Sequence, residues 1–222
     1  MRGRVSTGLS RQERRRLYTR GAILEAGVTL FAKRAVDAVS IDDITAAADI
    51  AKGSFYNHFE DKDDLAREIT RAVRSEVEER VGAANRDIVD PAVRVTRALC
   101  VIVLFGLESP QRAHALLRLH AGATLPNTPS NRGVRADLEA GVKSSRFSHF
   151  AVQTGLMAIL GTVQIALSRA LDASIPDITK SDIEDLAAFL LRGLGLSPAA
   201  AAKAAREGTE IFRLAKIVGR TA

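Results

Sequence analysis

Apolar residues recur along this chain at spacings of three and four over long stretches, while alternating runs of Val, Ile and Thr are nearly absent. Such spacing puts the apolar side chains on one face of an α-helix. The pattern therefore predicts an all-α protein. The expected helices are Arg11–Lys33, a short one from Ser40, Lys52–Phe59, Asp63–Asn85, Asp90–Leu107, Pro110–His120, Arg132–Lys143, His149–Leu171, Ser181–Leu194 and Pro198–Val218.

Polar residues mark where several of these helices begin. Ser40 can cap a helix, and Asp43, three residues on, completes a pair that resembles a capping box. Asp61 is the expected cap of the following long helix, which has carboxylates in its first turn. Ala121–Asn131 contains a glycine and two prolines and is the clearest expected loop.

The region Ser40–Phe59 predicts two short helices joined by a tight turn at Asp49–Ala51, which is the layout of a helix-turn-helix. At 100° per residue, Phe55 and Phe59 share one face of the second helix. We expect this face to pack inward, against Ile44 and Phe31. Because so short a helix does not persist alone, it needs a scaffold to hold it.

The opposite face of that helix is small and polar. Gly53 and Asn57 point away from the phenylalanines, Ser54 and Tyr56 lie on the flanks, and Lys52 stands at the amino end. A glycine that permits close approach, an amide, two hydroxyls and a cation suit the groove of a DNA duplex.

These motifs resemble the tetracycline-repressor (TetR) family of bacterial transcriptional regulators. The resemblance covers about Arg11–Leu65 and is carried by Leu30-Phe31, by Ser40-Ile41, by the run from Lys52 to Phe59 (Lys-Gly-Ser-Phe-Tyr-Asn-His-Phe) and by Lys62. It implies that one set of residues faces bases, namely Lys52, Gly53, Tyr56 and Asn57. It implies that a second set grips phosphates, namely Ser40, Ser54, His58 and Lys62. From the residues alone, His58 falls nearer the buried side and could equally be a surface histidine.

The resemblance also implies an organisation and a function. Residues 1–62 would form a DNA-binding domain with a basic N-terminal arm, and residues 63–222 a helical domain for effector binding and dimerisation. The expected protein is a repressor that binds a pseudo-palindromic operator as a homodimer and is released by a small-molecule effector. A DNA-independent helical adaptor that kept the fold remains the alternative.

The chain departs from the family pattern at a few positions. Ala35 and Asp49 stand where the family commonly has glycine, and Asp tolerates a left-handed backbone far better than Ala does. Ala51 replaces the usual serine cap and forgoes about 0.5–2 kcal/mol of capping. Asp42 and Asp43 put negative charge near the expected DNA face.

Charge is concentrated at one end of the chain. Met1–Arg20 carries seven basic residues and one acid, which accounts for the whole net charge of +6. A basic excess confined to one segment favours a polyanionic partner. Arg2 and Arg4 precede the first helix and either reach a minor groove or contribute nothing.

The second half carries no named motif, so its roles rest on the family. A homodimer interface is expected through His149–Leu171 and Ser181–Leu194, and ordinary core packing is the alternative for those apolar residues. An apolar or weakly acidic effector is expected, because the only two tyrosines, Tyr18 and Tyr56, are N-terminal and tryptophan is absent. The expected effector pocket consists of Cys100, Leu104, Phe105, Leu117, Phe147, Phe150, Gln153 and Met157.

Several function classes are disfavoured. The motifs of nucleophilic hydrolases, zinc proteases, phosphate-binding loops and paired C-x-x-C sites are missing, so we expect no enzyme, no metal and no cofactor. Cys100 is the single cysteine and cannot form an intramolecular disulfide. The absence of a long apolar run and the polar stretch Val5–Thr19 speak against a membrane span and a secretory signal, which predicts a cytoplasmic protein.

Overall fold

The computed structural model describes residues 10–119, 131–148 and 150–218. Within these ranges the chain forms ten α-helices and one 3-10 helix, and no strand. The all-α prediction is confirmed. The basic arm with Arg2 and Arg4, most of the expected loop Ala121–Asn131, and His149 lie outside the described residues.

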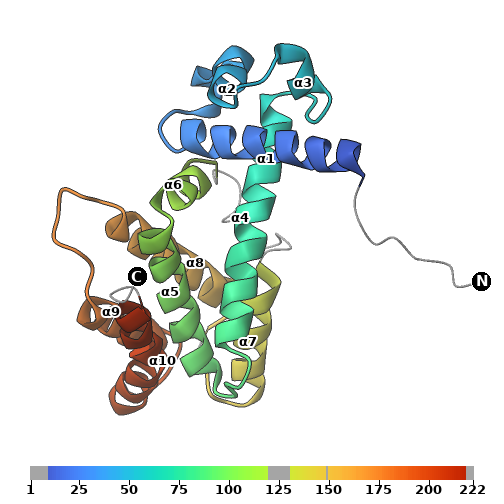
Figure 1. Cartoon of the computed structure of the whole chain (residues 1–222). Helices are drawn as coiled ribbons and strands as arrows, with labels where there is room; N and C mark the ends of the chain where they lie inside the picture. The colour runs from blue at the N-terminus through green and yellow to red at the C-terminus, as the bar shows by residue number, and fades with distance from the viewer. Residues whose placement is uncertain (1–9, 120–130, 149, 219–222) are drawn as a thin grey trace, which may run out of the picture.

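The N-terminal elements are α1 (Arg11–Phe31), the 3-10 helix η1 (Val36–Ala38), α2 (Ile41–Ala47), α3 (Lys52–Tyr56) and α4 (Lys62–Ala84). Figure 1 shows α1 lying across the upper part of α4, with α2 and α3 at that same end of the molecule. The lower part of α4 runs down beside the remaining helices. One continuous helix therefore belongs to both halves of the protein.

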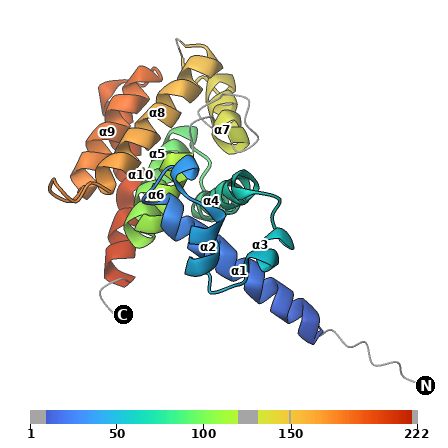
Figure 2. The ribbon, with the colours of Figure 1, turned by 90° about the horizontal axis from the view of Figure 1, so that it is seen from above.

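The remaining helices are α5 (Pro91–Glu108), α6 (Pro110–Leu119), α7 (Arg132–Lys143), α8 (Val152–Ala170), α9 (Lys180–Gly193) and α10 (Pro198–Val218). The central one is α5, which packs against α4, α6, α7, α8, α9 and α10. Seen from above, α8, α9 and α10 gather on one side of the molecule and α1 and α3 on the other (Figure 2).

The expected caps form hydrogen bonds. The Ser40 hydroxyl accepts the backbone N–H of Asp43, and the Asp43 carboxylate accepts the N–H of Ser40, which is a complete capping box. The Asp61 carboxylate likewise accepts the N–H of Asp64 at the start of α4. Each cap satisfies backbone donors that have no partner within the helix.

Two helices are shorter than the sequence indicates. The N–H groups of His58 and Phe59 both donate to the carbonyl of Phe55, so α3 ends at Tyr56 in a turn that carries Phe59 into the core. Helix α8 begins at Val152 because Phe150 folds back over Gly155, where a Cβ atom would lie 2.4 Å from the Phe150 ring. A contact between side chains sets each boundary, and helical periodicity does not report such a contact.

A buried cluster holds the N-terminal helices on α4. Phe31, Ile44 and Phe55 are fully buried and Phe59 nearly so, which confirms the inward face predicted for α3. Gly27 lets α1 cross α4 closely, since a Cβ atom there would lie 2.7 Å from Ile69 Cδ1. The cluster continues through Leu65, Ile69 and Val73 of α4 to Phe105, Leu116 and Leu167 of the helices below.

Candidate DNA-binding surface and effector cavity

The turn between α2 and α3 is tight. Asp49 has a φ of 52°, in the left-handed region where Asn and Asp are tolerated best among residues other than glycine. The N–H of the next residue, Ile50, donates to the carbonyl of Thr45 at 3.1 Å. The aspartate that replaces the family's glycine thus adopts the backbone conformation that a glycine would favour.

The outer face of α3 carries the four residues expected to face bases. Lys52, Gly53, Tyr56 and Asn57 are all exposed, and 53% of the Tyr56 surface is open. A Cβ atom added to Gly53 would meet nothing within 4 Å. This face of α3 is therefore open to a partner surface, while Phe55 anchors its other face in the core.

Lys52 is already engaged in an ion pair. Its Nζ lies 2.8 Å from Asp42 Oδ1 on α2, and both side chains are largely exposed. The hydrogen bond to Asp42, together with its charge, raises the pKa of Lys52 above its ordinary value. A DNA duplex would have to compete with Asp42 for this ammonium group.

The four residues expected to grip phosphates are held in different ways. Ser40 caps α2, and Ser54 is half-buried. The Lys62 ammonium donates to the carbonyls of Asp37 and Val39, at 3.2 Å each, so it also fastens η1 to the start of α4. Burial and the nearby guanidinium groups of Arg16 and Arg20 lower the pKa of His58. A neutral His58 can offer a phosphate one N–H group but no charge.

Other arginines on this side hold the domain together, and the sequence analysis assigned them no partner. Arg20 donates to Glu68 of α4 at 2.8 Å, and its guanidinium lies 5.2 Å from the centre of the Phe59 ring. Arg34 pairs with Asp43 at 3.4 Å. The i,i+3 and i,i+4 patterns cannot indicate such partners, because Arg20 and Glu68 lie on different helices and Arg34 lies in the turn after α1.

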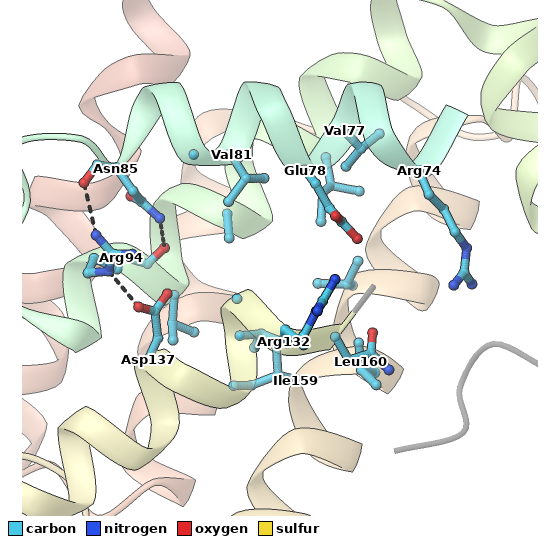
Figure 3. Close-up of a pocket in the computed structure, with 18 of the residues that line it drawn as sticks. Arg74, Val77, Glu78, Val81, Asn85, Arg94, Arg132, Asp137, Ile159 and Leu160 are labelled. Atoms are coloured by element: carbon cyan, nitrogen blue, oxygen red, sulfur yellow. Dashed lines mark hydrogen bonds and ion pairs between the residues drawn. The ribbon is translucent and has the colours of Figure 1, made fainter. Parts of the chain in front are cut away.

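The lower half of the molecule contains a cavity of about 420 Å³. Its walls come from five helices, α4, α5, α6, α7 and α8 (Figure 3). Most of the lining is apolar: Val77, Val81, Val95, Ala98, Ile102, Leu116, Leu117, Val134, Ile159, Leu160, Val163 and Leu167. Pockets of this size and character hold small organic molecules in many proteins.

Of the eight residues expected to form the effector pocket, Leu117 lines this cavity. Four others, Cys100, Phe105, Phe147 and Leu104, belong to or pack against the buried core clusters. Phe150 packs on Gly155, whereas Met157 and Gln153 are exposed. Burial raises the pKa of the Cys100 thiol to about 12, so it is an inert core group.

The expected set and the observed lining differ for a physical reason. Most of the predicted pocket residues are apolar or aromatic, and several of these, such as Phe105 and Phe147, fill the core where helices pack closely. The polar lining from α4 and α7 was not predicted from the sequence; it includes Arg74, Glu78, Asn85, Arg132 and Asp137. A signal was present, since Arg74, Glu78 and Asn85 interrupt the face of α4 that carries Val77 and Val81.

One end of the cavity is a hydrogen-bonded network. Arg94 Nε donates to Asp137 Oδ1 at 2.6 Å, and Arg94 Nη1 donates to the carbonyls of Asn85 and Ile88. The Asn85 side-chain amide donates in turn to the carbonyl of Arg94 at 3.1 Å. Burial raises the pKa of Asp137, although Arg94 acts in the opposite direction. The network joins the end of α4 to α5 and α7.

The middle and far end of the cavity carry further charges. Figure 3 shows Glu78 of α4 and Arg132 of α7 pointing toward one another, with Arg74 farther along α4. The cavity is therefore mostly apolar, with the Arg94–Asp137 network at one end and the charged Glu78, Arg132 and Arg74 along the rest of its length.

A third surface lies on the opposite side of the molecule from α3. On α8, Met157 and Ile165 are 59% and 69% exposed, and the exposed Gly161 lies between them; on α9, Phe189 is 76% exposed. Residues 157, 161 and 165 follow a four-residue spacing, so they form one stripe along the helix. Exposed apolar side chains that gather on one face are typical of surfaces that contact another protein.

Two other kinds of site were sought. Within residues 10–119, 131–148 and 150–218, no helix is long and apolar enough to cross a membrane. Over those same ranges, no group of three His, Cys, Asp or Glu side chains could hold a metal ion.

Comparison with known proteins also indicates a helix-turn-helix in the N-terminal part of the chain. Residues 23–69 match the model of the family described as "Bacterial regulatory proteins, tetR family". The HTH-type transcriptional repressor DhaR of Mycobacterium sp. (strain GP1) is 34% identical over 79 residues, which cover 36% of this chain and 40% of DhaR. The HTH-type transcriptional repressor KstR2 of Mycobacterium tuberculosis (strain ATCC 25618 / H37Rv) is 31% identical over 96 residues, 43% and 46% of the two chains. These matches span less than half the length of either relative.

Solved structures resemble the chain over most of its length. The structure of RolR in complex with the ligand resorcinol has 25% identity and a TM-score of 0.57, and the match covers 87% of this chain and 95% of RolR. A gamma-butyrolactone receptor (ArpA-like protein) has 20% identity and a TM-score of 0.65, with 87% and 97% of the chains covered. The second of these likenesses concerns the fold alone. Together with the helix-turn-helix, these similarities show that residues 23–69 are a DNA-binding domain of the TetR family of bacterial regulatory proteins, and they support that family of transcription regulators, which are not enzymes, for the chain as a whole.

Proposed function

We propose that this protein is a transcriptional repressor that binds a pseudo-palindromic DNA operator as a homodimer and leaves it when a small-molecule effector enters the cavity. Residues 1–62 act as the DNA-binding domain and residues 63–222 as the effector-binding and dimerisation domain. The protein works on the chromosome in the bacterial cytoplasm. The relatives DhaR and KstR2 are transcriptional repressors.

One observation carries the DNA-binding part of the proposal. Helix α3 has only five residues, yet Phe55 is fully buried while Lys52, Gly53 and Tyr56 are exposed beside it. A core anchor under a polar, outward-facing helix is how recognition helices are presented to the major groove. Lys52, Gly53, Tyr56 and Asn57 would contact bases, and Ser40, Ser54, His58 and Lys62 would contact phosphates.

The homodimer rests on the apolar stripe of α8 and α9. Two copies that join through Met157, Ile165 and Phe189 would form a four-helix interface, with Gly161 allowing the helices to approach closely. A two-fold interface would present two copies of α3, which matches the symmetry of a pseudo-palindromic operator.

The link from effector to DNA would run through α6. Leu116 and Leu117 line the cavity, and the next residue, Arg118, donates from Nε to the carbonyl of Ala32 at the end of α1, 2.9 Å away. An effector that moves α6 would therefore move the support of α1. It can lower DNA affinity only by the difference between its affinities for the two conformations. RolR, which resembles this chain over most of its length, binds resorcinol, so a small hydroxylated aromatic molecule is a reasonable first effector to test.

The test compares single variants on one DNA duplex. A fluorescent duplex recovered by selection from a random pool is titrated with wild-type protein, with Lys52→Ala and with Tyr56→Ala. Each variant should weaken binding about tenfold or more, because each loses a groove contact. Lys203→Ala, at an exposed lysine of α10, is the matched control and should bind like the wild type. Equal binding by all four proteins would contradict a DNA-reading α3.

A further inference from the structure

The polar end of the cavity contains a buried hydrogen-bond acceptor without a donor among the described residues. Asn85 is 1% exposed and lines the cavity. Its Nδ2 donates to the carbonyl of Arg94, which fixes the orientation of the amide. No residue that the structure describes donates to the other atom of that amide, Oδ1, which is buried. Buried polar atoms are nearly always paired, so an unpaired one beside a cavity points to a ligand.

Asp137 supplies a second acceptor at the same end. Its Oδ1 takes the hydrogen bond from Arg94, and the carboxylate is only 14% exposed. The oxygens of an ionised carboxylate accept hydrogen bonds and do not donate them. Arg94 cannot turn freely to a ligand, because it holds Asp137 and the carbonyls of Asn85 and Ile88 together.

The rest of the cavity restricts what the donor can be attached to. Val77, Val81, Ile159 and Leu160 lie between the acceptor end and Arg74 (Figure 3). From Arg74 to Asn85, α4 rises about 16 Å at 1.5 Å per residue, so the cavity has room for an elongated molecule, with Glu78 and Arg132 set among the apolar residues of this stretch. Three arginines and two acids line the cavity, Arg74, Arg94, Arg132, Glu78 and Asp137, and this balance disfavours a cation.

We propose that the cavity selects uncharged molecules with an apolar body and a hydroxyl group, such as phenols and alcohols, and that this hydroxyl donates to Asn85 Oδ1 with Asp137 as the neighbouring acceptor. The inference rests on the proposed function only in that the cavity is the effector site. A ligand carboxylate at this end would bring its negative charge against Asp137. The buried Asp137 already has a raised pKa, which is the response of a carboxylate to lost hydration.

Three probes of one skeleton test the proposal, namely β-naphthol, its methyl ether and β-naphthoate. The ether keeps the oxygen and removes the donor, and the naphthoate replaces the hydroxyl with a carboxylate. Their affinities for the full-length protein are measured by calorimetry at neutral pH, without DNA. We expect β-naphthol to bind about tenfold more tightly than either of the others, since a buried acceptor is left unpaired by both.

Variants of the acceptors identify the site. Asp137→Asn keeps an oxygen for Arg94 and turns the second acceptor into a donor, and Asn85→Leu removes the amide. Asn85→Leu should reduce the preference for β-naphthol over its ether to about one, and Asp137→Asn should reduce it in part, because Asn85 Oδ1 is still present. Ile159→Val, in the apolar wall, is the control and should weaken all probes equally, so that the preference remains. Circular dichroism and the thermal midpoint establish that each variant is folded.

The outcomes separate this inference from the proposed function. Equal binding of the three probes to the wild-type protein, or no binding at all, would contradict the proposed acceptor site. So would a preference that survives both Asp137→Asn and Asn85→Leu in folded protein. Because no DNA is present, failure of operator binding would remove the proposed function and leave this result unchanged.

Discussion

The two functional regions of the protein are built in opposite ways. The proposed DNA-binding surface comes from one short stretch, Ser40–Lys62, in which exposed side chains such as Lys52 and Tyr56 lie beside the buried Phe55. The cavity draws its lining from five helices between Arg74 and Leu167. The first region works because its side chains are exposed, whereas the second depends on polar groups held within an apolar interior. A substitution in the first can abolish function without unfolding the protein, but in the second the two effects are coupled.

Adjacent residues of α3 give the sharpest contrast. Phe55 is fully buried, so Phe55→Ala should lower the free energy of unfolding by about 3–5 kcal/mol. Tyr56 is exposed and only its ring edge meets Phe55, at 5.5 Å between centroids, so Tyr56→Ala should cost about 1 kcal/mol or less. Urea denaturation of both variants measures the difference.

The same pair is then tested on DNA. Tyr56→Ala should lose specific binding while remaining folded. If Tyr56→Ala destabilised the protein as much as Phe55→Ala does, the assignment of Phe55 to core packing and of Tyr56 to DNA contact would be wrong.

The cavity network gives the next largest effect. Arg94→Met leaves the largely buried Asp137 without its partner and should lower the free energy of unfolding by about 3 kcal/mol. In the double variant that also carries Asp137→Leu, much of the lost stability should be recovered, because no buried charge is left unpaired. Chemical denaturation measures the free energy of unfolding of the single and double variants. Equal stability of the two variants would contradict the pairing of Arg94 with Asp137.

Ser40 combines a cap with an expected phosphate contact, and two substitutions separate these roles. Ser40→Ala removes the cap and should cost about 1 kcal/mol of stability. Ser40→Asp keeps a good cap but brings a negative charge to the phosphates, so stability should hold while DNA affinity falls. DNA affinity that stays unchanged in Ser40→Asp would assign Ser40 to the fold alone.

The smallest effect on stability is expected at the exposed pair of Asp42 and Lys52. Asp42→Asn should leave the denaturation curve unchanged, since exposed ion pairs contribute little. The substitution should raise DNA affinity several-fold and steepen the dependence of that affinity on salt, because Lys52 no longer has to break an ion pair before it binds DNA. An affinity that falls would show that Asp42 positions Lys52 for its DNA contact.

The contrast between the regions also explains what the sequence could predict. Helix positions, the Ser40 and Asp61 caps and the inward turn of Phe55 and Phe59 follow from residues a few positions apart, and all of these were predictable. Helix α3 ends early and α8 begins late because of where Phe59 and Phe150 pack. These are contacts that local patterns do not encode.

The cavity was the least predictable part. Its polar end requires Asn85, Arg94 and Asp137 to meet from three helices, and their separation along the chain carries no signal of that meeting. Aromatic residues such as Phe105 and Phe147 were natural pocket candidates, yet each is buried in a core cluster. Large apolar residues pack where helices approach closely, and a cavity remains where they do not.

Selection of bound sequences from a random duplex pool tests the central claim most directly. The full-length protein is mixed with the pool, bound duplexes are recovered, and the enriched sequences are compared with those recovered by Tyr56→Ala. The account predicts a pseudo-palindrome for the wild type, with half-sites related by the two-fold symmetry of a dimer, and no enrichment for the variant. Absence of any enriched sequence for the wild-type protein would contradict it.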